Sequence, residues 1–242
     1  MSEQETLLAD VPLVADPDAS KEMGAADVEA IADEDIKGSR LLLVRRVVEP
    51  IDLDGTAGGV VQLVCTFQPA EGTRFSSAQF RLRLATPAGL RVVDLAPRVI
   101  DDAHPVEITI DKKGKLGLNI ASVPLEPSIE IGSSKKYVRY HCAVQGSGAG
   151  TNLARWDFRE NPDRQDGIGR EQVLTLTLSQ TGAVTGNVIV SARLVRSGLR
   201  GRIEAIRDMI VGSDSGDRTY PIALEVPKAP SPDGLSSFFK LF

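Results

Sequence analysis

The sequence predicts an all-β protein, an antiparallel β-sandwich with one peripheral helix near residues 198–211. Aromatic residues make up only 5% of the chain, so the core must rely on Val, Leu and Ile, which favour strands. Short runs in which apolar and polar residues alternate recur along the chain, and turns rich in Gly and Pro separate them. Many short strands at regular spacing are typical of two packed antiparallel sheets.

Each expected strand follows from such a run. The clearest is 78–84, where Ala78, Phe80 and Leu82 face one way and Arg81 and Arg83 the other. The turn Asp111–Gly114 joins 106–110 to 115–120 as a hairpin. The full set of expected strands is 41–48, 60–67, 78–84, 90–95, 106–110, 115–120, 128–132, 137–145, 153–158, 172–179, 187–195 and 220–226.

One segment departs from the strand period. Leu199, Ile203, Ile206 and Ile210 recur at helical spacing, and Ser197 is placed to cap a helix over 198–211. We expect this helix to pack on the sheet or to close one end of it.

Charge divides the chain into three parts. Residues 1–38 hold 11 Asp or Glu and 2 Lys, and we expect them to form an acidic, largely disordered arm. Residues 39–226 form the β-sandwich domain. Residues 227–242 form a Pro-rich linker and an aromatic tail.

The two cysteines bear on the fold and on the compartment. Cys65 and Cys142 lie in strand-like runs, and Tyr140 precedes Cys142 with the Tyr-x-Cys spacing that resembles an immunoglobulin domain. An immunoglobulin-like arrangement and a distorted barrel are therefore both open as variants of the sandwich. We expect two buried thiols in a cytoplasmic protein, since the sequence shows no secretory signal.

No pattern for catalysis, metal or cofactor keeps the spacing that its chemistry requires. His141 and Cys142 are adjacent in a strand, so their side chains point to opposite faces. Asp52-Leu53-Asp54-Gly55 lacks the closing Glu of a calcium loop. We therefore expect no catalytic residue, no metal, no cofactor and no nucleic-acid partner, and a membrane is not among the expected partners.

The C-terminal tail carries the most distinctive feature. After three prolines the chain ends in a cluster of apolar residues, Leu235, Phe238, Phe239, Leu241 and Phe242. Burying each aromatic ring is worth roughly 2–3 kcal/mol, so we predict that these residues bind a protein partner, a neighbouring copy, or the chain's own domain.

The leading functional hypothesis is a soluble, non-catalytic interaction or assembly module whose tail docks on a partner or neighbouring subunit. A second hypothesis is a hydrolase with a dispersed polar site around 160–171, using Asp163, Asp166, Arg170 or Glu171. A third is a membrane-active β protein, in which the helix at 198–211 and the tail are released as in toxin-like β proteins.

Overall fold

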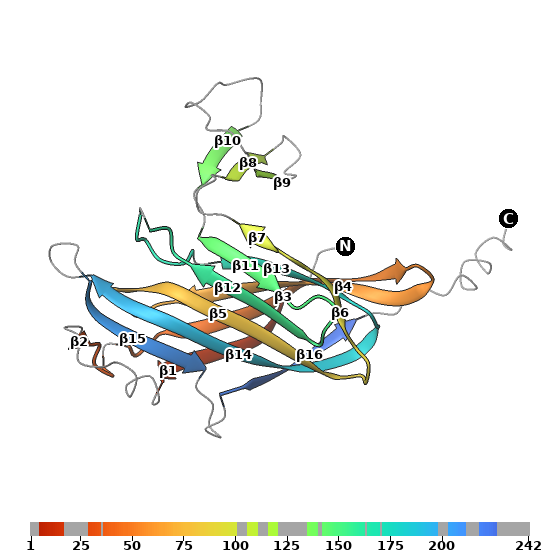
Figure 1. Ribbon diagram of the computed structural model, residues 1–242, viewed down its shortest axis with the longest axis horizontal. Helices are drawn as coiled ribbons and strands as arrows, with labels where there is room; N and C mark the ends of the chain where they lie inside the picture. The colour runs from red at the N-terminus through yellow and green to blue at the C-terminus, as the bar shows by residue number, and fades with distance from the viewer. Residues whose placement is uncertain are drawn as a thin grey trace, which may run out of the picture.

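Antiparallel strands make up nearly all of the regular structure in the computed structural model (Figure 1). It describes residues 5–16, 29–34, 36–100, 106–110, 116–120, 135–139, 142–162, 164–169, 171–197, 203–211 and 218–226. The strands are β1 Thr6–Ala15, β2 Glu29–Ala30, β3 Arg40–Leu53, β4 Thr56–Gln68, β5 Thr73–Thr86, β6 Val92–Ala96, β7 Val99–Ile100, β8 Val106–Ile110, β9 Leu116–Ile120, β10 Lys135–Arg139, β11 Ala143–Ser147, β12 Leu153–Arg159, β13 Glu171–Leu178, β14 Gly182–Ser197, β15 Ile203–Val211 and β16 Tyr220–Val226.

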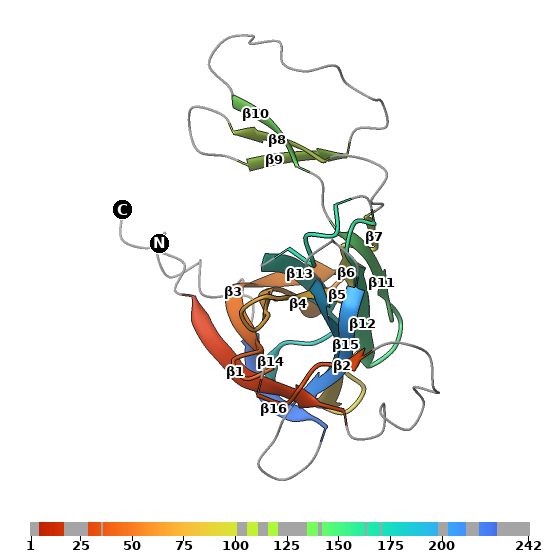
Figure 2. The ribbon, with the colours of Figure 1, turned by 90° about the vertical axis from the view of Figure 1, so that its left-hand side faces the viewer.

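Thirteen of these strands form one sheet that curls until it is nearly closed and barrel-like (Figure 2). Its order is β6-β13-β4-β3-β1-β15-β14-β5-β12-β11-β7, with β16 paired to β14 and β2 to β15. The pairing is antiparallel except between β2 and β15. The all-β prediction is confirmed at this level.

Strand β1 joins the two halves of the sheet. Its residues Thr6–Pro12 pair with β3, and after this Leu13–Ala15 pair with β15. Pro12 therefore sits where β1 has a partner on one side, which a residue without an N–H tolerates. The sequence prediction places this stretch in a disordered arm; instead Ala9, Val11 and Leu13 are buried, so the body begins at Thr6.

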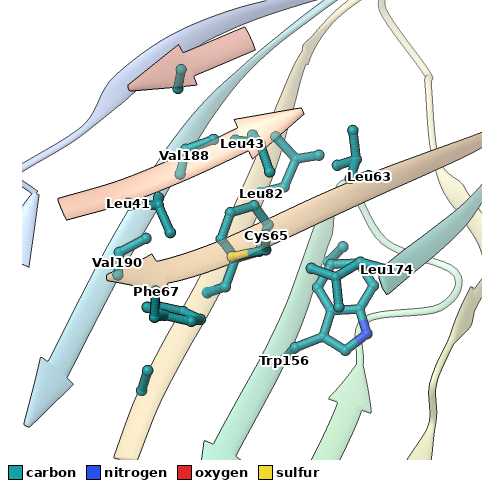
Figure 3. Close-up of a cluster of buried hydrophobic side chains, with 14 of the residues drawn as sticks. Leu41, Leu43, Leu63, Cys65, Phe67, Leu82, Trp156, Leu174, Val188 and Val190 are labelled. Atoms are coloured by element: carbon teal, nitrogen blue, oxygen red, sulfur yellow. The ribbon is translucent and has the colours of Figure 1, made fainter. Parts of the chain in front are cut away.

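The core lies inside the curled sheet, where side chains from both halves meet. Phe67 of β4 packs edge-on against Phe158 of β12, with ring centroids 5.5 Å apart, and Phe80 lies 6.0 Å from Trp156. Figure 3 shows Phe67 and Trp156 among aliphatic side chains from β3, β13 and β14. The alternation predicted for β5 is confirmed, since Ala78, Phe80, Leu82 and Leu84 are all buried.

The helix expected over 198–211 is wrong where the structure describes that segment. Residues Ile203–Val211 form β15, which pairs with β14 on one side and with β1 on the other. Met209 and Val211 are buried while Asp208 is partly exposed, which is the period of a strand. No helix occurs in the residues that the structure describes.

The strands β10, β8 and β9 form a separate small sheet in that order. Figure 1 shows it above the body, beyond β7 and β11. The pairing of Val106 with Ile120 and of Ile110 with Leu116 confirms the predicted hairpin. The expected strand 128–132 lies outside the described residues.

The two edges of the large sheet come together at Gly146. Its N–H donates to the Arg98 carbonyl at 2.7 Å, and a Cβ added here would overlap the Pro97 carbonyl and the Leu95 side chain. We predict that Gly146→Ala lowers the free energy of unfolding by about 1–3 kcal/mol, because the added methyl forces the edges apart. Urea unfolding measures this.

Gly169→Ala is the matched control, since its methyl would approach only the end of the Gln172 side chain, at 3.3 Å. Equal effects of the two substitutions would show that the close approach at Gly146 is unimportant.

Candidate functional site

A polar trough crosses the outer face of the sheet over β7, β11, β12, β5, β14 and β15. It encloses about 900 Å³. Its central row follows the strand register from Val99 through Gln145, Asp157 and Gln79 to Ser191. Because side chains alternate across a strand, the residues between these rows, such as Val144 and Phe158, point into the core.

The carboxylates of the trough are held by cationic groups. Arg155 donates to both oxygens of Asp157 at 2.7 and 2.8 Å, and Gln79 donates to Asp157 at 2.7 Å. Arg193 binds Asp208 at 2.8 Å, and Arg218 lies 3.3 Å from Asp16. Carboxylates bound in this way are poor general bases, so the trough favours binding over acid–base chemistry.

The trough also marks where a long excursion leaves the body. Val99, Ile100 and Ala143 line it, and Val144 pairs with Ile100 in an antiparallel register. Residues 101–142 thus begin and end on two hydrogen-bonded neighbours. The small sheet β10-β8-β9 belongs to this excursion.

The structure describes only part of the predicted hydrolase site around 160–171. Glu160 and Arg74 form a largely buried ion pair at 2.9 Å, and Glu160 also accepts from the Gly167 N–H at 3.1 Å. This pair fixes the 160–169 loop on β5. Asp166 and Glu171 are exposed, while Asp163, Arg170, His104 and His141 lie outside the described residues.

Both cysteines lie in the part of the chain that the structure describes. Cys65 and Cys142 are free and buried, as expected. Leu235, Phe238, Phe239, Leu241 and Phe242 lie outside the described residues, so tail binding stays a prediction. Across the described ranges, no group of three or more His, Cys, Asp or Glu is placed to hold a metal ion. No helix in that part of the chain is long and apolar enough to cross a membrane.

Comparison with solved structures returns two toxins and a protein titled as pore forming. The delta-toxin of Clostridium perfringens is 11% identical, with 76% of this chain and 83% of that chain covered and a TM-score of 0.35. A structure titled pore forming protein is 10% identical, covering 81% and 93%, with a TM-score of 0.29. The NetB toxin of Clostridium perfringens in its membrane-inserted form is 8% identical, covering 91% and 94%, with a TM-score of 0.34.

No protein-family model matches the sequence. No curated protein matches it either.

These comparisons correct the leading hypothesis. The chain was expected to be a soluble, cytoplasmic interaction or assembly module, with no membrane among its partners. The solved structures that it matches are titled as toxins and as pore forming. The module hypothesis, the cytoplasmic location and the exclusion of a membrane partner are therefore wrong.

Asp157 makes the trough sensitive to acid. Burial raises the pKa of this carboxyl, but the hydrogen bonds from Arg155 and Gln79 outweigh burial and lower the pKa overall. A lowered folded-state pKa stabilises the fold above about pH 4, and this stabilisation is lost as the pH falls through the folded-state pKa.

We predict that Asp157→Asn lowers the melting temperature by a constant amount above about pH 5, and that the gap to the wild type narrows below about pH 4. Thermal unfolding followed between pH 2.5 and pH 7 measures the gap. A gap in melting temperature that does not depend on pH would contradict the lowered pKa of Asp157 in the folded protein.

Neither cysteine thiol should react with maleimide in the folded protein. Burial raises the pKa of Cys65 and of Cys142, so neither forms a thiolate readily near neutral pH. We predict that maleimide labels neither cysteine until the chain is unfolded in guanidinium. Mass spectrometry before and after unfolding checks this, and labelling of the native protein would contradict it.

Proposed function

We propose that the chain is a membrane-active β protein and that the excursion 101–142 supplies the segment that enters the bilayer. The observation that carries this proposal is the parity of its apolar residues. In the first half they occupy even positions, Val106, Ile108, Ile110, Leu116, Leu118 and Ile120. Over 121–132 they occupy odd positions, Val123, Leu125, Ile129 and Ile131.

The register between β8 and β10 supports one common apolar face. Ile108 pairs with Tyr137 and Ile110 pairs with Lys135, so even positions oppose odd ones. Continuing that register towards the tip sets Leu116 opposite Ile129 and Ile120 opposite Leu125. Residues directly opposite each other in a sheet share a face, so the apolar residues of both halves would gather on one side of a single long hairpin.

The opposite face of that hairpin is polar. It would carry Glu107, Thr109, Lys115 and Asn119 in one strand, and the same continuation sets Glu130 opposite Lys115. Strands in which lipid-facing apolar residues alternate with polar ones are the pattern of proteins that cross a bilayer with β-strands.

The length of the segment is also suitable. A strand needs about 9–11 residues to cross the hydrocarbon region when it is tilted. The stretches 113–121 and 124–132, which flank the tip, supply this length and contain no charged residue on the apolar face.

The described arrangement of the excursion differs from this hairpin. Strand β9 lies beside β8, paired from Val106–Ile120 to Ile110–Leu116. In the proposed membrane form, β9 leaves this position and continues β8, while the β8–β10 register is kept. The expected release of a helix at 198–211 is not part of the proposal, because Ile203–Val211 form strand β15.

We further propose that the curled sheet is a sandwich of two layers. One layer would be β6-β13-β4-β3-β1, and the other would be β15-β14-β5-β12-β11-β7. The contact between Phe67 and Phe158 supports this division, since it joins β4 to β12 across the core. Such a body would remain folded while the excursion changes partners.

The test is dye leakage from lipid vesicles. We predict that the full chain releases dye and that Leu118→Lys reduces the rate about 30-fold or more, because a lysine facing lipid near the bilayer midplane costs about 2–4 kcal/mol. Asn119→Lys is the matched control on the same strand. Its side chain has the opposite parity, so leakage should stay within about threefold of the wild type.

Two outcomes would contradict the proposal. One is vesicles that stay intact with the wild-type chain in both neutral and anionic lipid. The other is an equal loss of leakage in Leu118→Lys and Asn119→Lys, since the parity of the segment would then have no role.

A further inference from the structure

An apolar stripe crosses the outer face of β1, β3, β4 and β13. Leu7 pairs with Val44, Val44 with Val64, and Val64 with Val173, so these four residues form one row across the strands. We call them the apolar stripe. None of the four belongs to the core cluster, which places the row on the outside of the sheet.

The exposure along the stripe is unusual for the surface of a sheet. Leu7 is 59% exposed and Val173 is 42% exposed, while Val64 between them is 4% exposed. Leu42 adds a fifth apolar side chain two residues from Val44 along β3, opposite Thr66. Ion pairs flank the row, from Arg46 to Glu5 at 2.9 Å and from Arg40 to Asp10 at 2.6 Å. An apolar centre with a charged rim is the composition of a docking surface.

We infer that the aromatic end of the chain, residues 235–242, covers the apolar stripe in the same molecule. This segment offers Leu235, Phe238, Phe239, Leu241 and Phe242, which are large apolar groups for an aliphatic surface. The inference is independent of the proposed membrane function, because the stripe lies over other strands of the outer face than the trough and the excursion.

The length of the tail suits this occupant. The last described residue, Val226, packs against Gly59 of β4, where an added Cβ would overlap its side chain. Val64 lies five residues further along β4, about 17 Å away at roughly 3.3 Å per residue. Crossing to the outer face adds the thickness of one layer, about 10 Å. Phe238 follows Val226 by twelve residues, which span up to about 40 Å.

The size of the stripe favours a tethered segment over a separate molecule. A stable dimer needs about 1,200–2,000 Å² of buried surface, which four side chains and a neighbour do not supply. A segment of the same chain docks at an effective concentration in the millimolar range, so a small patch is sufficient. The stripe also lacks the Trp and Tyr that are enriched where proteins meet a membrane interface.

Thiol accessibility tests the inference in the full chain. Val173→Cys places a thiol in the stripe, and Val93→Cys places one on β6, where the wild-type residue is also 42% exposed. Each variant is compared with the same variant carrying Phe238→Ser, Phe239→Ser and Phe242→Ser. We expect the altered tail to raise the maleimide rate at Val173→Cys about tenfold and to leave the rate at Val93→Cys unchanged.

Three results would overturn the inference that the aromatic end of the chain covers the apolar stripe. The rate at Val173→Cys could be the same with both tails, which would mean that the tail does not cover the stripe. Protection that rises with protein concentration would assign the stripe to a second copy. Protection that arises only with phosphatidylcholine vesicles would assign it to a membrane.

A second measurement reports the contact directly. The full chain with Val173→Cys and Phe239→Cys should form a disulfide within one molecule under mild oxidation, visible as a monomer of altered mobility. The pair Val93→Cys and Phe239→Cys should not. Equal yields from the two pairs would also overturn the inference.

Discussion

The fold depends on how the large sheet ends. Its two edge strands, β6 and β7, are consecutive in sequence, and only Pro97 and Arg98 lie between them. One short stretch of chain therefore carries both edges, and the sheet must curl until they meet. The hydrogen bond from Gly146 to Arg98 and the absence of a side chain at Gly146 allow this approach. Once the edges meet, the inward faces of β4, β5, β12, β13 and β14 enclose one core.

Sequence alone gave most of the strands, and the reason is the strength of the period-2 pattern on a one-sided sheet. Every inward residue of β5 from Ala78 to Leu84 is buried, as alternation requires. Two segments were misread. Ile203, Ile206 and Ile210 fit a helical spacing, but pairing with both β14 and β1 overrides that local preference. In β1, Asp10 and Pro12 gave the appearance of disorder, although they alternate with the buried Ala9, Val11 and Leu13.

The functional site was harder to predict because its signal is distributed. Nothing in the trough forms a sequence motif: Gln145, Asp157, Gln79 and Ser191 come from four strands and meet only through register. The change of parity between Ile120 and Val123 was present in the sequence, but it gains meaning only when the β8–β10 register is known.

The position of β1 constrains the order in which the strands of the sheet can pair. Leu13 pairs with Val211, so this part of β1 can pair only after a strand almost two hundred residues later in the chain has been made. Contacts of such high sequence separation slow folding, because the entropy cost of closing a long loop comes before the hydrogen bonds that offset it. The sheet cannot be completed until β15 has been synthesised. Leu13–Ala15 at the end of β1 are therefore among the last residues of the sheet to find a partner.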